Sequence, residues 1–239
     1  MVLHSKVRWV MTLACVCALT APAAAQAAKK SKPPASQPPV ATTAGATGTG
    51  TRALWHMDEK SGSTMVDSSG NGHNGSLSSI QLGVAGFSGT AYGFSRSTVT
   101  VPTASDLNPG SQTLTVTIHM KTTSAPANPD WDLFRKGQYT TSGGEWKMEY
   151  QPNGQASCGF KGSGGYSELA AGPSLKNGQW HTVSCRRTSS QIQVIIDGQT
   201  FSKSANIGTI ANSAPVIMGS YPGAEFFQGA LDEASIAFG

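Results

Sequence analysis

Apolar and polar residues alternate along most of this chain, and that period-two pattern restricts the fold more than any other feature of the sequence. In TLTVTIHM, residues 113–120, the apolar side chains fall on one face of an extended strand: Leu114, Val116, Ile118 and Met120. Gly or Pro interrupts nearly every window of about 12 residues, so no helical stripe of apolar side chains develops. The pattern predicts an all-β protein.

Turn residues divide the strands into hairpins. The stretch EWKMEYQPNGQASCGF predicts two strands joined at Asn153-Gly154, and QIQVIIDGQTF predicts a second hairpin at Asp197-Gly198. Further strands are expected in RALWHMDE, AYGF, STVTVP, WHTVSCRR, APVIMGS and GALDEASIAF. Many short strands separated by turns favour an antiparallel sandwich or barrel.

The first 27 residues are typical of a secretory signal peptide. Lys6 and Arg8 precede an apolar run from Trp9 to about Ala21, and an A-x-A cleavage pattern follows at residues 25–27. The apolar run is too short to span a bilayer, which needs about 20 residues. We therefore expect a secreted, extracellular protein with no membrane span.

Residues 28–50 are rich in Pro, Thr, Ala and Lys and predict a disordered linker before a folded domain at residues 51–239. A lipoprotein alternative at Cys15 lacks the usual Leu three residues before the cysteine. The formal charge of +4 falls to +2 once Lys6 and Arg8 leave with the signal peptide, which is no signature of nucleic-acid binding.

Two cysteines remain after removal of the signal peptide, Cys158 and Cys185. In an exported chain a single pair predicts a disulfide. A thiolate metal site is not expected, because the sequence has no C-x-x-C and no clustered His.

Three segments, in order and spacing, resemble the laminin-G-like domains of the concanavalin A-like lectin/glucanase superfamily. They are the opening ALWHMDEKSGSTMVDSSGNGHNGSL, the central KNGQWHTVSCRRTSSQIQVIIDGQ and the closing FFQGALDEASIAF. The resemblance runs from about Arg52 to Phe238 and implies a two-sheet antiparallel β-sandwich of jelly-roll type. Trp180 and Val183 are expected in its core. The fold alone does not define the function, because it serves lectins, adhesion modules, pentraxin-like proteins and hydrolases.

The loop VDSSGNGHNGSL, residues 66–77, has two interpretations. Asp67 can cap a turn in which Gly70, Gly72 and Gly75 supply positive φ angles. Alternatively, oxygens of Asp67, Asn71 and Asp232 can hold a structural calcium ion, as relatives often do near the sandwich rim. No other cofactor is expected.

Catalytic patterns are missing from the sequence. The glucanase branch carries Glu-x-Asp-x-x-Glu, whereas here Glu145 and Glu149 stand four apart without an Asp between them, on the outward face of their strand. His181 would need a carboxylate partner that the sequence does not reveal. We therefore predict a protein that is not an enzyme, with a glycoside hydrolase as the less favoured alternative.

Aromatic side chains among Gly, Pro and Ser predict ligand-binding loops, because aromatic rings stack on the apolar faces of sugars. The candidates are Trp131, Tyr139, Tyr166 and Tyr221, and the alternative for each is that it pins its own loop. The sequence thus favours a non-catalytic module that recognises extracellular carbohydrate through rim loops. A protein-binding adhesion module with a cell-surface protein partner is the alternative.

Overall fold

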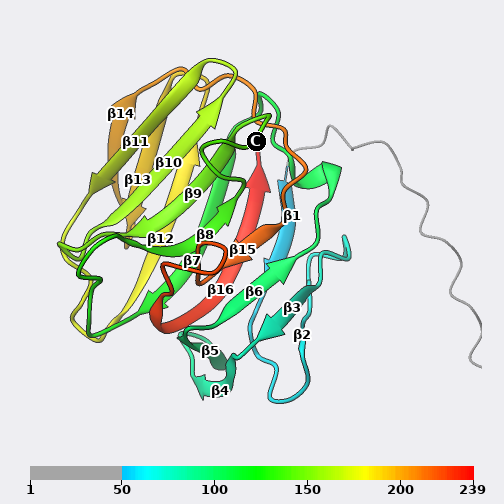
Figure 1. Cartoon of the computed structure of the whole chain (residues 1–239), viewed down its shortest axis with the longest axis vertical. Helices are drawn as coiled ribbons and strands as arrows, with labels where there is room; N and C mark the ends of the chain where they lie inside the picture. Colours follow the sequence, from blue (N-terminus) through cyan, green and yellow to red (C-terminus); the bar gives the residue numbers. More distant parts are fainter. Residues whose placement is uncertain (1–49) are drawn as a thin grey trace, which may run out of the picture. The chain divides into compact units, whose positions relative to one another are not determined.

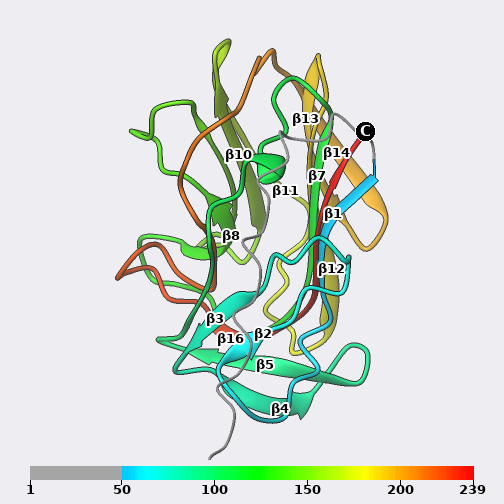
Figure 2. The ribbon, with the colours of Figure 1, turned by 90° about the vertical axis from the view of Figure 1, so that its right-hand side faces the viewer.

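The computed structural model describes residues 50–239, which form two antiparallel sheets packed face to face (Figures 1 and 2). The expected signal peptide and all but the last residue of the expected linker lie outside the described residues. Apart from one 3₁₀ turn, Ser105–Leu107, the assigned elements in this part of the chain are strands. None of the described segments is a helix long and apolar enough to cross a membrane.

Sheet A has eight strands, and β16 lies at its centre. Its order is β14 (Gln199–Ser204), β13 (Gln191–Ile196), β12 (Trp180–Arg187), β7 (Leu114–Lys121), β16 (Gln228–Phe238), β5 (Thr90–Ser95) and β4 (Gln81–Ala85). The first strand, β1 (Gly50–Trp55), pairs with the second half of β16, so that Gly50 lies opposite Phe238.

Sheet B also has eight strands. Its order is β11 (Gly165–Ala171), β10 (Ala156–Gly162), β9 (Glu145–Tyr150), β8 (Trp131–Lys136), β15 (Val216–Met218), β6 (Thr98–Val101), β3 (Gly75–Ser78) and β2 (Thr64–Met65). The strands β8 to β11 follow one another in space as in sequence, which is the arrangement of a meander.

The core lies between the sheets and is built by the predicted alternation. Residues that follow the apolar and inward-facing positions in sequence point to the outer faces of the sheets. The apolar positions of 113–120 and the inward positions of β9 and β10 are fully buried: Leu114, Val116, Ile118, Met120, Trp146, Met148, Tyr150, Ala156, Cys158 and Phe160. Burying one such large side chain stabilises the fold by about 1.5–3 kcal/mol.

Cys158 on β10 and Cys185 on β12 form the predicted disulfide, with Cα atoms 5.4 Å apart. Because β10 belongs to sheet B and β12 to sheet A, the bond joins the two layers through the core. Both predicted hairpin turns also form, and Asp197 and Gly198 adopt positive φ angles of 49° and 84°.

Two positions differ from expectation. Trp180 was expected in the core, but it is half-buried on the outer face of sheet A because Val183 and Cys185 take the inward positions of β12. Gly75 does not adopt a positive φ; it is buried in β3, where a Cβ would lie 2.9 Å from the Met65 side chain and 3.0 Å from that of Val99. The glycine is needed there for close packing.

Candidate functional site

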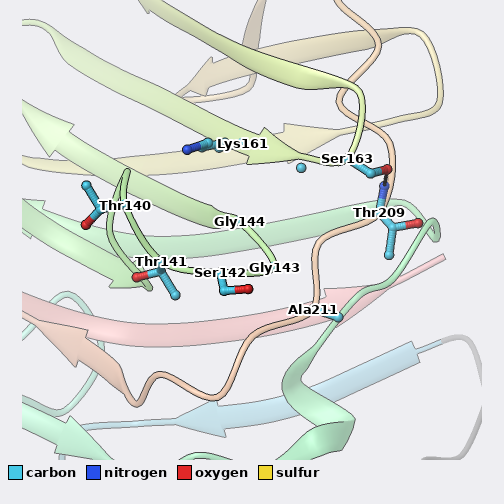
Figure 3. Close-up of a pocket in the computed structure, with 10 residues that line it drawn as sticks. Thr140, Thr141, Ser142, Gly143, Gly144, Lys161, Ser163, Thr209 and Ala211 are labelled. Carbon is cyan, nitrogen blue, oxygen red and sulfur yellow. Dashed lines mark hydrogen bonds between the residues drawn. The ribbon is translucent and has the colours of Figure 1, made fainter.

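The outer face of sheet B carries a groove of about 520 Å³ between three loops (Figure 3). Its walls come from the β8–β9 loop, the β10–β11 turn and the segment before β15. The lining residues are Thr140, Thr141, Ser142, Gly143, Gly144, Lys161, Gly162, Ser163, Thr209 and Ala211. Thr140 and Lys161 lie at one end of the groove, and Ser163 and Thr209 lie at the other (Figure 3).

Backbone contacts hold the groove open and fix its floor. The amide of Ala211 donates to the carbonyl of Gly143 (2.9 Å), and that of Ser163 donates to the carbonyl of Thr209 (3.0 Å). A Cβ at Gly143 would stand 1.8 Å from the Ala211 oxygen, and one at Gly144 would stand 2.0 Å from the Lys161 oxygen. Only glycine allows this close approach of the loops.

Two of the aromatic residues selected from the sequence meet beside this groove. Tyr139, in the β8–β9 loop, and Tyr166, on β11, pack edge to face with ring centroids 5.3 Å apart. They are 58% and 38% exposed. The ammonium of Lys161 lies 4.0 Å from the centroid of the Tyr139 ring and donates to the Tyr139 carbonyl. A lysine that lines the groove thus connects it to the aromatic pair.

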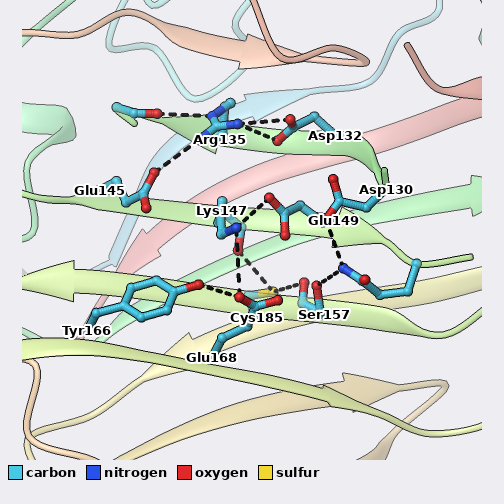
Figure 4. A network of polar contacts seen from close by, with 12 residues as sticks. Asp130, Asp132, Arg135, Glu145, Lys147, Glu149, Ser157, Tyr166, Glu168 and Cys185 are labelled. Atoms are coloured by element: carbon cyan, nitrogen blue, oxygen red, sulfur yellow. Dashed lines mark hydrogen bonds and ion pairs between the residues drawn. The ribbon is translucent and has the colours of Figure 1, made fainter. Parts of the chain in front are cut away.

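A chain of polar contacts fixes Tyr166 from beneath (Figure 4). Its hydroxyl donates to the carboxylate of Glu168, and Lys147 lies 3.8 Å from the same carboxylate. The ammonium of Lys147 also donates to Glu149 at 2.6 Å. Gly159 leaves room for this lysine, because a Cβ there would stand 2.6 Å from its side chain.

Glu145 and Glu149 lie on the outward face of β9, as expected, but both are buried, and so is Asp132 on β8. Asp132, Glu145 and Glu149 are 0%, 1% and 3% exposed. Arg135 donates to both oxygens of Asp132 at 3.0 and 2.8 Å and to Glu145 at 3.0 Å.

Burial changes the ionisation of this network. It raises the pKa of Glu149 to about 7 against the opposing effect of the Lys147 ammonium, and it raises the pKa of Asp132 against that of Arg135. One oxygen each of Glu145 and Glu149 has no hydrogen-bond partner. Acids that are buried and ion-paired in this way fit a structural role better than attack on a polymer.

The other two selected aromatic residues have different partners. Trp131 was expected in a loop, but it begins β8 and is only 9% exposed. Its ring stacks on that of Tyr150, with centroids 6.1 Å apart, and packs edge-on against Phe227 at 6.0 Å. Tyr221 covers Arg135, whose guanidinium carbon is 4.6 Å from the ring centroid. These two rings therefore pin their own segments, and ligand contact by either stays a prediction.

The residues selected for calcium serve two different turns: Asp67 and Asn71 lie in the loop between β2 and β3, and Asp232 holds the β4–β5 turn. Asp67 accepts hydrogen bonds from the amides of Leu54 (3.0 Å), Ser69 (2.9 Å) and His73 (2.9 Å). Burial raises its pKa, but these hydrogen bonds outweigh burial and hold the value below the usual range. The Asn71 side-chain amide donates to the carbonyl of Arg52 at 2.9 Å.

Asp232 is buried on β16 and accepts hydrogen bonds from the amides of Phe87 (2.8 Å) and Ser88 (3.1 Å) in the β4–β5 turn. Among residues 50–239, no three His, Cys, Asp or Glu side chains gather as a metal site. Protein N–H groups already use the carboxylate oxygens of Asp67 and Asp232, which supports turn capping by Asp67, and calcium binding stays a prediction.

His181 has a partner that the sequence does not reveal. Its ring contacts the carboxylate of Asp197 at 2.7 Å and the side chain of Asn177 at 3.0 Å. Asp197 also accepts a hydrogen bond from the amide of Thr182 at 2.8 Å. The pair therefore closes the β13–β14 turn against β12.

Comparison with known families gives one match, to the laminin-G-like model described as the concanavalin A-like lectin/glucanases superfamily, over residues 93–237. The match begins within β5 and ends in β16, so the opening segment that resembles the family lies outside it. No curated protein matches the sequence.

Solved structures share the fold at low sequence identity. The binding domain of Paraclostridial Mosquitocidal Protein 1 is 17% identical, with a TM-score of 0.63 over 79% of this chain and 48% of that one. The binding domain of Botulinum neurotoxin DC, in complex with rat synaptotagmin II, is 11% identical, with a TM-score of 0.59 over 78% of this chain and 48% of that one. This chain thus spans about half the length of either toxin domain.

A third structure has a similar length. Domain 4 of AbnA, a GH43 extracellular arabinanase from Geobacillus stearothermophilus in complex with arabinotriose, is 18% identical. The likeness covers 80% of this chain and 94% of that one, with a TM-score of 0.59.

Proposed function

The chain belongs to the laminin-G-like family of the concanavalin A-like lectin/glucanases superfamily, and from this membership we propose that it is an exported, non-catalytic module that binds carbohydrate. The observation that carries the proposal is the Tyr139–Tyr166 pair beside the groove on sheet B. An exposed aromatic pair can stack on the C–H face of a sugar ring, while nearby polar groups bond the hydroxyls.

The lining of the groove suits hydroxyl-rich ligands. Hydroxyl groups come from Thr140, Thr141, Ser142, Ser163 and Thr209, and Lys161 adds a donor between the groove and the rings. The backbone contacts at Gly143 and Gly144 fix the walls before any ligand arrives, which lowers the ordering cost of binding.

The fold comparison supports the same ligand class. Domain 4 of the arabinanase matches this chain over nearly its whole length and is in complex with arabinotriose. It is a separate domain of an enzyme, which is the setting expected of a carbohydrate-binding module.

The absence of catalysis is proposed from the arrangement of the acids. The ten residues that line the groove include no carboxylate. The nearest outward acids of β9, Glu145 and Glu149, are buried and paired with Arg135 and Lys147. Glycoside hydrolysis needs two carboxyl groups that reach the substrate.

Export is proposed from the signal peptide pattern in residues 1–27 and is supported by the disulfide, which is typical of oxidising compartments. Protein recognition at a cell surface is the second candidate function. The neurotoxin binding domain is in complex with a protein, rat synaptotagmin II, and the exposed rings of Tyr139 and Tyr166 suit a protein interface as well.

Affinity electrophoresis of the mature chain in gels that contain arabinan, xylan, mannan or β-glucan tests the carbohydrate proposal. Tyr166→Ala should weaken retention by the recognised polysaccharide about tenfold, or about 1.4 kcal/mol. Tyr166→Phe keeps the ring but loses the hydrogen bond to Glu168, so it should weaken retention less than Tyr166→Ala does. Val66→Ala, which shortens an exposed apolar side chain in another loop, is the matched control.

Unchanged retention of Tyr166→Ala would reject this site, and hydrolysis products from any polysaccharide would reject the non-catalytic assignment. Capture of a cell-surface protein without retention by any polysaccharide would favour the second candidate. Repeating the gels with EDTA reports on the calcium site predicted from the sequence.

A further inference from the structure

A second aromatic surface lies on the outer face of sheet A. Phe87, at the tip of the β4–β5 hairpin, is 52% exposed. Its ring stacks on the His119 ring with centroids 3.9 Å apart and an interplanar angle of 24°, and it meets Trp180 at 6.5 Å and 75°. We call these three residues the Phe87 platform.

The fold fixes this platform although its apolar ring faces solvent. The amides of Phe87 and Ser88 donate to the carboxylate of Asp232, which has no exposed surface. Burial raises the pKa of Asp232 to about 6 against the opposing effect of these hydrogen bonds. A buried carboxylate thus holds an exposed aromatic tip in one position, although the platform contributes little apolar burial to the core.

The strands beneath the hairpin bring His119 and Trp180 to the same face. His119 on β7 lies opposite Thr182 on β12, and Lys121 lies opposite Trp180. The hairpin strands β4 and β5 form one end of sheet A, next to β16 (Figures 1 and 2). Its tip therefore crosses β16 to reach β7.

Carboxylates border the platform. The β-bulge in β16 puts Glu233 in a left-handed conformation, φ 46°, and its side chain contacts His56 at 2.8 Å. Burial lowers the pKa of His119, and the nearby charges of Glu233 and Asp197 act in the opposite direction. Glu233 follows Asp232, which lies opposite His119 on β16. Asp197 accepts a hydrogen bond from the amide of Thr182, which lies opposite His119 on β12. Both carboxylates therefore lie close to the aromatic rings.

A groove of about 360 Å³ adjoins the platform at Lys121, which lines the groove and neighbours Trp180 in the sheet. The groove combines apolar and polar lining groups. Its lining residues are Gln81, Val84, Ala85, Gly93, Lys121, Thr122, Thr123, Gly229 and Ala230. Platform and groove together form an extended surface that combines a flat ring, acceptors and donors.

We propose that the Phe87 platform and this groove form a second carbohydrate-binding site, which holds a neutral polysaccharide chain on the face of the sandwich opposite the Tyr139–Tyr166 pair. The C–H face of a sugar ring stacks on Phe87, its hydroxyls donate to Glu233, and Gln81 and Lys121 bond the next residue. Glu233 and Asp197 repel a uronate or sulfate, which is why the site takes a neutral sugar.

The inference rests on the proposed function only for the class of ligand, since different residues on a different sheet carry it. Two sites on opposite faces let one molecule bridge two polymer chains, and each site then raises the apparent affinity of the other.

The test is affinity electrophoresis of the full mature chain in arabinan, xylan, mannan, β-glucan and polygalacturonate. Phe87→Ala should weaken retention by a neutral polysaccharide at least fivefold, both alone and in a Tyr139→Ala/Tyr166→Ala background. Phe87→Trp keeps a stacking ring and should bind like the wild type. Gln81→Ala, in the adjoining groove, is a second variant that removes one donor without touching the hairpin turn.

The outcomes separate the two sites. Loss of binding in Phe87→Ala with no effect of the tyrosine variants supports this site and rejects the first one. Loss in the tyrosine variants alone, with Phe87→Ala and Gln81→Ala unchanged, rejects this site and keeps the first. Three other outcomes also overturn the inference. The wild type could be retained by polygalacturonate alone, or by no polysaccharide at all. Alternatively, Phe87→Ala could lose a captured protein partner while its retention by polysaccharides stays the same.

Discussion

Removing the disulfide between the sheets should destabilise the protein strongly. Cys158 and Cys185 are separated by 27 residues and are both fully buried, and their bond joins β10 of sheet B to β12 of sheet A. In the loop-entropy model, a bond that closes a loop of this length stabilises by about 3.5 kcal/mol at 25 °C, because it restricts the unfolded chain. The double variant Cys158→Ala/Cys185→Ala also loses the packing of two sulfur atoms, about 1 kcal/mol more.

The predicted loss is large compared with the stability of a typical domain, about 5–15 kcal/mol. For a domain of this size it corresponds to a fall in Tm of roughly 10–15 °C. Guanidinium unfolding of the oxidised wild type and of the double variant, each with and without dithiothreitol, measures it. Once unfolding exposes the disulfide, dithiothreitol should lower the free energy of unfolding of the wild type. It should leave that of the double variant unchanged.

A difference below about 1 kcal/mol between oxidised wild type and the double variant would refute the reasoning, because the loop term alone exceeds it. The reasoning would also be refuted if dithiothreitol lowered the unfolding free energy of the double variant as much as that of the wild type, since that variant has no disulfide to reduce.

Three further predictions test the structure. Gly219 and Gly223 share a φ of 81°, but a Cβ at Gly219 would stand 2.2 Å from the Phe94 ring and one at Gly223 would meet nothing within 4 Å. Urea unfolding should therefore show Gly219→Ala to be about 1–3 kcal/mol less stable than Gly223→Ala, and equal stabilities would contradict the packing. Asp67→Ala should cost about 2–4 kcal/mol, because three backbone amides lose their acceptor, and a loss under 1 kcal/mol would reject the cap. The pKa of Glu149, raised from 4.5 to about 7 by burial, means that the native state holds its proton more tightly than the unfolded chain. The free energy of unfolding of the wild type should then fall by up to about 3 kcal/mol as the pH rises from the unfolded pKa of 4.5 through the native pKa of about 7. Urea unfolding at pH 5 and pH 8 measures this fall, and Glu149→Gln should lack the part that comes from this carboxyl group.

The strands could be predicted because each depends on a local pattern. Alternation in 113–120 and the Asn153-Gly154 and Asp197-Gly198 turns give the correct elements. The disulfide could also be predicted, because the folded part holds only one pair of cysteines.

What the sequence could not show depends on cross-strand neighbours. Trp131 looks exposed among Pro and Asp, but Tyr150 and Phe227, distant in sequence, enclose it. Glu145 and Glu149 face outward as predicted, yet both are buried, and Arg135 and Lys147 pair with them. The enclosure of Trp131 and the burial of these acids depend on contacts that no local pattern encodes.

Only part of the candidate sites could be predicted from the sequence. Tyr139 and Tyr166 were selected individually, but their pairing depends on the β10–β11 hairpin and the β8–β9 loop meeting. Phe87 was missed because GFSGT looks like an ordinary turn. The sequence feature that could have pointed to Phe87 is the Leu-Asp-Glu segment at residues 231–233. Its buried Asp232, distant in sequence, accepts the hydrogen bond from the Phe87 amide that fixes the turn.

Because Gly50 pairs with Phe238 on adjacent strands, the sandwich is a candidate for circular permutation (Figure 1). A few glycine or serine residues can join these positions, and new termini opened in the exposed Asp197-Gly198 turn would leave every ladder of both sheets intact. The same geometry makes the module insertable, since a host protein would receive it through two points only one strand apart.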